Sequence, residues 1–184
     1  MAKRKTLAER TRAESAEVLY PAEQIVTVDA AVIDELKQAA AKNPRQRIRI
    51  CAHRSVDDRV HEMLIVHTRD TYVRPHRHTG KSESFHVIDG DVDVVLFDDA
   101  GAVADVIQMG SFASGRTFFY RIADPVYHTL LIRSEVLVFH EATTGPFRRE
   151  ESNFAPWAPD ESDPAAVSAF LTSVNERAAA HLKP

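Results

Sequence analysis

Residues 72–90, YVRPHRHTGKSESFHVIDG, carry the most informative pattern in this chain. They place His76, His78 and Glu83 within eight residues. Side chains two apart on a β-strand point to the same face, so both imidazoles can face one point, with the carboxylate on the next strand. Imidazole and carboxylate ligands together suit zinc, iron, nickel and manganese. The same residues also fit a solvated polar loop, because a short motif is weak by itself.

The sequence on both sides of this stretch has the pattern of short β-strands. RQRIRICAHR, residues 45–54, alternates between charged and apolar positions, and HEMLIVHT, residues 61–68, has few polar interruptions. We expect the second of these strands to be covered on both faces. Asp89-Gly90 and residues 98–101 read as hairpin turns between later strands. Many short strands without helices between them indicate a β-sandwich or barrel.

One helix is predicted on each side of the strands. Asp29 is a suitable N-cap for a helix over residues 30–43. Asp163 and Pro164 are suited to the N-cap and first position of a second helix that runs to residue 182.

These patterns divide the chain into three parts. Residues 1–28 are expected to form an irregular basic arm, and residues 29–146 a β-barrel domain with its leading helix. Residues 147–184 are expected to form an extension whose helix packs on the barrel.

Composition narrows the class of protein. A chain of 184 residues with 44% hydrophobic residues is long enough for one domain with a real core. Its net charge of −4 argues against nucleic-acid binding. Without a run of about 18 apolar residues, no membrane span is expected. The first residues lack the apolar segment of a secretory signal, and the single cysteine, Cys51, reads as a core residue. We therefore expect a cytoplasmic protein.

Two motifs resemble those of the cupin superfamily. PHRHTGKSE followed by FHVIDG has the two histidines, the glutamate and the closing glycine of the first cupin motif, and DPVYHTL offers His128 for the second. The chain departs from the pattern where Asp70 replaces the leading glycine and Ile132 replaces the trailing asparagine of the second motif. These departures concern local turns and leave the ligand positions filled.

The resemblance extends to one group of cupins, the WbuC family. Residues 45–83, then YHTLL, then GPF and FAPWAP look like that family over roughly residues 30–170. It implies a cupin-type double-stranded β-helix, or jelly-roll barrel, that binds one divalent transition metal per chain, such as iron, manganese, nickel or zinc. The ligands it implies are His76, His78, Glu83 and His128. For His128 the alternative is a core histidine beneath Tyr127.

Other polar side chains are candidates for substrate binding near this site. The set comprises Arg47, Arg49, His53, His61, Tyr72 and Tyr120. Inward-facing arginines would bind an anionic group such as a carboxylate or phosphate. The alternatives are an exposed strand face for the arginines and ordinary core packing for the tyrosines.

Three functions follow from these expectations. The first is a metal-dependent isomerase- or epimerase-like enzyme acting on a small anionic or nucleotide-sugar substrate, which the family's name links to surface-polysaccharide (O-antigen) metabolism. The second is a metal-dependent dioxygenase, and the third is a metal or ligand sensor without turnover. In each case we expect a small-molecule ligand and a homodimer.

Overall fold

The computed structural model describes residues 5–183, which form two β-sheets and three α-helices. In chain order the elements are α1 (Leu7–Arg10), β1 (Thr11–Ala13), β2 (Val18–Pro21), α2 (Ala30–Lys42), β3 (Arg47–Cys51), β4 (Val60–Thr68), β5 (His76–His78), β6 (Glu83–Asp89), β7 (Asp91–Phe97), β8 (Val103–Gly110), η1 (Phe112–Ser114), β9 (Phe119–Ile122), β10 (Tyr127–Ile132), β11 (Val136–Thr144), η2 (Arg149–Glu151), β12 (Ser152–Phe154) and α3 (Pro164–His181).

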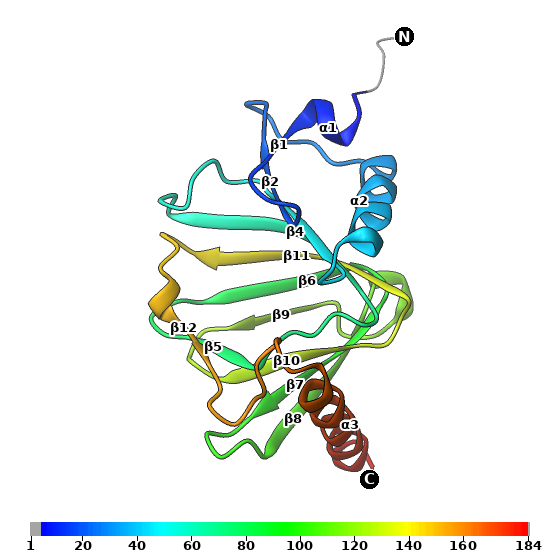
Figure 1. The fold of residues 1–184 in the computed structure, drawn as a ribbon, viewed down its shortest axis with the longest axis vertical. Coiled ribbons are helices and arrows are strands. Elements are labelled where there is room, and N and C mark those ends of the chain that lie inside the picture. Colours follow the sequence, from blue (N-terminus) through cyan, green and yellow to red (C-terminus); the bar gives the residue numbers. More distant parts are fainter. Residues whose placement is uncertain (1–4, 184) are drawn as a thin grey trace.

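The eight strands β4 to β11 form a jelly roll (Figure 1). Part of one sheet has the order β4-β11-β6-β9, and part of the other has the order β5-β10-β7-β8. If β4 to β11 are numbered 1 to 8 along the chain, the strand order is 1-8-3-6 in the first sheet and 2-7-4-5 in the second. The chain therefore crosses repeatedly between two antiparallel sheets, as in the two Greek keys of a jelly roll. This confirms the predicted cupin-type double-stranded β-helix.

Each sheet is extended beyond the eight-strand core. β3, β2 and β1 continue the first sheet, with β2 pairing in parallel with β3, and β12 adds an edge to the second sheet beside β5. The expectation of an irregular N-terminal arm is wrong for residues 7–21, which form a short helix and a hairpin. Residues 1–4 lie outside the described part of the chain.

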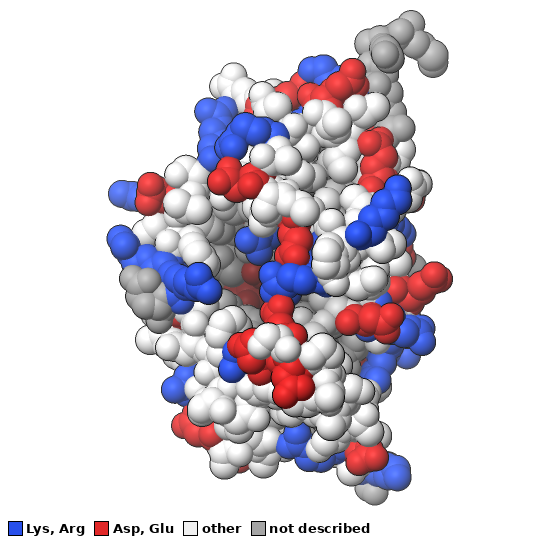
Figure 2. Space-filling view, viewed as in Figure 1, with Lys and Arg blue, Asp and Glu red and all other residues white. Residues whose placement is uncertain are grey.

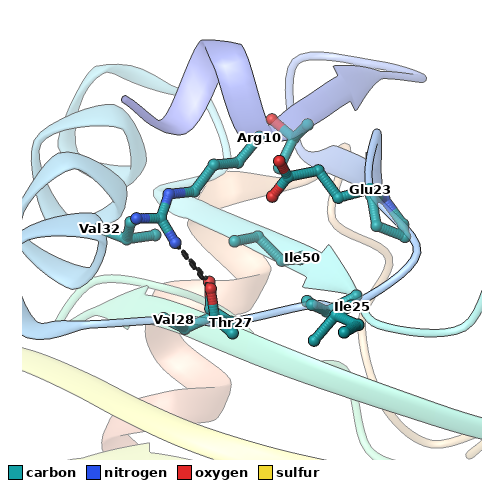
Figure 3. Close-up of a pocket in the computed structure, with 10 residues that line it drawn as sticks. Arg10, Glu23, Ile25, Thr27, Val28, Val32 and Ile50 are labelled. Carbon is teal, nitrogen blue, oxygen red and sulfur yellow. Dashed lines mark hydrogen bonds between the residues drawn. The ribbon is translucent and has the colours of Figure 1, made fainter. Parts of the chain in front are cut away.

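A half-buried arginine, Arg10, holds the N-terminal hairpin against the body of the protein. Arg10 donates hydrogen bonds to the carbonyl oxygen and hydroxyl of Thr27, and Val32 and Ile50 lie beneath it (Figure 3). This anchoring needs tertiary contacts, so local sequence alone gave no sign of it.

Three apolar clusters account for the layering. The central cluster lies between the sheets and includes Phe85, Phe139 and Met109. A second cluster packs α2 on the outer face of the first sheet, with Leu36 fully buried. A third packs α3 and Trp157 on the outer face of the second sheet. Because α2 covers part of its outer side, β4 is buried on both faces from Ile65 to Thr68, as predicted, whereas its outward-facing Val60 and Glu62 are exposed.

The predicted helix starts are confirmed. Asp29 accepts a hydrogen bond from the backbone N–H of Val32, and Asp163 accepts one from that of Ala166. Each side chain thereby satisfies a backbone donor that the first helical turn leaves unpaired. Cys51 is buried in the central cluster, as expected of a core residue.

Gly90 closes the turn between β6 and β7. Its φ is +91°, and a Cβ at this position would lie 2.4 Å from the carbonyl oxygen of Val136. Both the backbone angle and the close approach require glycine, which gives the closing glycine of the motif a physical reason.

Across residues 5–183, no helix combines the length and the apolar character needed to span a membrane.

Candidate metal centre

Three strands bring the four predicted ligands together. His76 and His78 lie on β5, His128 lies on β10 directly opposite His76, and Glu83 begins β6 in the facing sheet. One nitrogen of each histidine and one oxygen of Glu83 all lie within 4.8 Å of one another. Three imidazoles and one carboxylate converging at this distance form a donor set suited to a divalent transition metal.

The imidazole rings are held so that their Nε2 atoms face inward. Nδ1 of His76 lies 2.9 Å from the carbonyl oxygen of Arg74, and Nδ1 of His128 lies 3.0 Å from that of Val126. Nδ1 of His78 lies 3.4 Å from the hydroxyl of Ser152. An outer oxygen on Nδ1 fixes the tautomer that leaves Nε2 free to bind a metal, a feature common to metal-ligating histidines.

Glu83 is held from both of its oxygens. Its Oε2 lies 3.2 Å from Nε2 of His78 and 3.6 Å from Nε2 of His128. Its Oε1 accepts a 2.9 Å hydrogen bond from the hydroxyl of Tyr120. The glutamate is 4% exposed, so its charge depends on these partners.

Burial and proximity set the ionisation of the cluster. Burial, followed by the neighbouring His128 and His78, lowers the pKa of His76 to about 3. Burial alone would raise the pKa of Glu83, but His128 and His78 hold it well below its ordinary value. Burial alone would lower the pKa of His128, but Glu83 raises it. Glu83 is therefore anionic and His76 neutral, the forms in which these side chains bind metals.

The two candidate arginines differ in their surroundings. Nε of Arg47 lies 3.1 Å from Glu17, and its guanidinium also approaches Glu161 at 3.9 Å. Arg49 is exposed, and no carboxylate of residues 5–183 lies within ion-pair distance of it. The Arg49 guanidinium is therefore available to bind an anion, as predicted, whereas that of Arg47 is already paired with acidic side chains.

The remaining substrate-binding candidates lie in different places. Tyr120 is beside the cluster through Glu83. His53 and His61 are buried and stack on each other, with ring centroids 4.0 Å apart. Tyr72 donates a hydrogen bond to the carbonyl oxygen of Pro159, within the packing of the C-terminal extension. Only Tyr120 among them hydrogen-bonds a residue of the cluster.

Glu141 was not among the candidates drawn from the sequence. It lies on β11, between Phe85 of β6 and Met63 of β4. Burial and the Glu83 carboxylate raise its pKa to about 8. Its sequence signal is a carboxylate two residues after Phe139, at a position that faces inward like Leu137 and Phe139.

The space between the sheets opens on one face of the molecule. In the view of Figure 1, the surface is hollowed near its centre, and basic and acidic side chains gather around the hollow (Figure 2). A small molecule can therefore approach the strands that carry the cluster.

Comparisons of the sequence with known proteins find one family, whose function is unknown. A family model described as "Domain of unknown function (DUF6016)" matches residues 28–109. No curated protein matches the sequence.

Several solved structures are similar in fold. A protein from Shewanella oneidensis has a TM-score of 0.54 at 9% identity, over 82% of this chain and 97% of that protein. An RmlC-like cupin family protein with a double-stranded β-helix fold, from Methanocaldococcus jannaschii, has a TM-score of 0.42 at 13% identity, over 56% of this chain and 84% of that one. A putative sugar phosphate isomerase from Acidithiobacillus ferrooxidans has a TM-score of 0.39 at 14% identity, over 48% of this chain and 51% of that one.

The likeness to the Shewanella protein concerns the fold alone. The match spans about half the length of the isomerase and nearly all of the Shewanella protein. The topology and the four converging donors together define a cupin-fold protein with a candidate metal centre.

Proposed function

We propose that this protein is a metal-dependent cupin of the WbuC type that acts on a small anionic substrate. One divalent transition metal per chain, which could be iron, manganese, nickel or zinc, would be held by His76, His78, Glu83 and His128. The observation that carries the proposal is the convergence of three Nε2 atoms and a buried carboxylate within 4.8 Å, with the outer side of each imidazole bonded to oxygen.

The donor set favours a ligand-binding or catalytic centre over a purely structural one. Three histidines and one glutamate leave one or two positions open on a five- or six-coordinate metal. A divalent metal there would polarise a substrate carbonyl or hydroxyl oxygen and make a neighbouring proton easier to remove. We infer an isomerase- or epimerase-like reaction on this basis, with a sugar-derived or nucleotide-sugar substrate following from the family resemblance alone.

The protein's own residues would prepare this centre in two ways. Tyr120 orients Glu83 through the hydrogen bond to Oε1. The backbone oxygens of Arg74 and Val126 fix the rings of His76 and His128.

We also propose that the protein is a cytoplasmic homodimer. Light scattering would test its oligomeric state.

Elemental analysis tests the metal assignment. Protein purified without added metal should contain about one transition-metal ion per chain. His76→Ala and His78→Ala should each abolish loading. His140→Ala is the matched control, because His140 lies on β11 outside the cluster. Folded protein that cannot be loaded with any of the four metals would refute the assignment.

The chemistry is tested on the loaded protein. Nuclear magnetic resonance in deuterium oxide should show exchange of a substrate carbon-bound proton, because the proposed reaction removes a proton from the carbon next to the polarised oxygen. Oxygen uptake with iron-loaded protein would favour a dioxygenase instead. A ligand that binds with no product from any loaded form would favour a sensor.

A further inference from the structure

β3 presents two different faces to the rest of the protein. Ile48 and Ile50 pack with α2 on the outer side of the sheet. Because side chains alternate along a strand, Arg49 points to the opposite side, as does Cys51, which is part of the cluster between the sheets. Arg49 thus stands on the same side of its sheet as Glu83.

Arg49 is the inward arginine without an acidic partner. It is exposed, although it lies near the buried His67 and Cys51, whose pKa values it affects. Arg47, two residues earlier on the same face, is paired with Glu17. An exposed guanidinium on the inner face of the sheet, with no carboxylate among the described residues to neutralise it, is suited to an anionic ligand because it offers several N–H donors in one plane.

Glu141 lies between Arg49 and the candidate metal ligands. The register places it beside Met63, whose other neighbour is Cys51 on β3. On its other side, Thr143, two residues along β11, pairs with Glu83. Arg49 lowers the pKa of Glu141 and Glu83 raises it, so Glu141 is close enough to both groups to feel their charges.

The carboxyl group of Glu141 has no protein partner of its own. Within the described part of the chain, no side chain or backbone group hydrogen-bonds or ion-pairs with it, and the residue is partly accessible. A carboxyl group in a largely buried position ordinarily has such a partner. The partly accessible carboxyl group is therefore available to hydrogen-bond a polar group of a ligand.

The strand order and register set the spacing between Arg49 and the candidate metal ligands. Neighbouring strands are about 4.8 Å apart, so β3 and β6 are separated by roughly 14 Å across β4 and β11. Along the strands, Arg49 is level with Phe139 and Glu83 is level with Thr143, so the two residues are also offset by four positions. Glu141 lies within this interval and on the same face of the sheet.

We propose that Arg49 and Glu141 form the ligand-recognition half of the cavity: Arg49 binds the carboxylate or phosphate of a small hydroxylated organic anion, and Glu141 hydrogen-bonds the hydroxyl group next to it. The inference rests on the proposed metal function, because the other end of the ligand would face the metal. It narrows the substrate class to molecules that carry an anionic group a few atoms away from an oxygen.

Isothermal titration calorimetry of metal-loaded protein tests this. Malate is the carboxylate probe, glycerol 3-phosphate is the phosphate probe, and glycerol is the uncharged reference. Arg49→Gln should weaken binding of the preferred anion by about 10- to 100-fold, the range expected when a charge-assisted hydrogen bond is lost. Arg47→Gln, the matched control on the same strand face, should change it less than about threefold, because Arg47 is already paired with Glu17.

Glu141 is tested by two substitutions. Glu141→Gln keeps a hydrogen-bonding side chain of the same size, so it should retain anion affinity within about threefold. Glu141→Leu removes the polar atoms and should weaken binding about tenfold. Equal affinities for the two variants would refute the role of Glu141.

The outcomes separate this inference from the metal assignment. The same titrations are repeated after treatment with EDTA, and metal content is measured on every sample. Anion binding that depends on Arg49 but not on Arg47 supports the inference, whether or not metal is bound. Failure of both anions to bind at millimolar concentration, or equal losses in the two arginine variants, would overturn it even if metal loading is normal.

Discussion

Tyr120→Phe should weaken metal binding without disturbing the packing of the ring. The tyrosine is 8% exposed, and its ring stacks on Phe85 with centroids 5.2 Å apart. Phenylalanine keeps this ring and removes only the hydroxyl, which donates a 2.9 Å hydrogen bond to Oε1 of Glu83. The substitution therefore isolates one interaction with the carboxylate.

The expected magnitude follows from the nature of that bond. A hydrogen bond to a charged group contributes about 1.5–3 kcal/mol. Since about 1.4 kcal/mol corresponds to a tenfold change in affinity, the metal dissociation constant should rise by about 10- to 100-fold. The loss of an outer partner of a metal ligand has an effect of the same size in other proteins. Glu83 would also be left with an unpaired, buried oxygen, so the metal-free protein should unfold at a lower temperature.

The assay is competition with a chromogenic chelator, combined with calorimetry of the metal-free protein. Tyr127→Phe is the matched control, because Tyr127 is also buried and its hydroxyl has no hydrogen-bond partner among residues 5–183. If the two variants bind metal within threefold of each other and unfold alike, the orienting role of Tyr120 is wrong.

Three further predictions concern stability. Leu36→Ala should lower the free energy of unfolding by about 2–5 kcal/mol in urea denaturation, because Leu36 is fully buried beneath α2; a loss below about 1 kcal/mol would contradict this packing. Gly145→Ala should lower the melting temperature more than Gly115→Ala, because its Cβ would lie 1.8 Å from the carbonyl oxygen of Asp58, whereas at Gly115 a Cβ meets open space and only the positive φ of +74° opposes it; similar shifts would count against the close approach. Burial lowers the pKa of His67 to about 3 in the folded protein, whereas its pKa in the unfolded chain is about 6.5. Between these two pH values the unfolded chain binds one more proton than the folded protein, so the stability falls as the pH falls through this window. Between pH 6.5 and 5 this contributes a loss of roughly 2 kcal/mol in denaturant titrations, which His67→Phe should remove; an unchanged pH dependence would exclude His67 as its source.

Local sequence patterns were sufficient to predict the α2 and α3 helices, the β-strands and the fold class. The N-caps Asp29 and Asp163 and the period-two strands depend on interactions between residues close in sequence. Gly90 is likewise required by its own backbone angle. The irregularity expected of residues 7–21 was wrong because that hairpin is fixed by distant partners such as Thr27.

The sequence alone also determined which four residues form the candidate site. The spacing of His76, His78 and Glu83, together with the resemblance that added His128, was enough to select them. Their convergence, however, depends on β10 lying beside β5 and on β6 facing them from the other sheet. Contacts between strands far apart in sequence are set by the closure of the barrel.

Only the tertiary structure distinguished the two arginines and revealed Glu141. Arg47 and Arg49 are the same residue type on the same strand face, but of these two only Arg47 lies within ion-pair distance of Glu17. The environment of Glu141 likewise comes from three different strands. Charge pairing and burial arise between segments that meet only in the folded chain, so the ligand half of this site was decided by the fold and the metal half by the sequence.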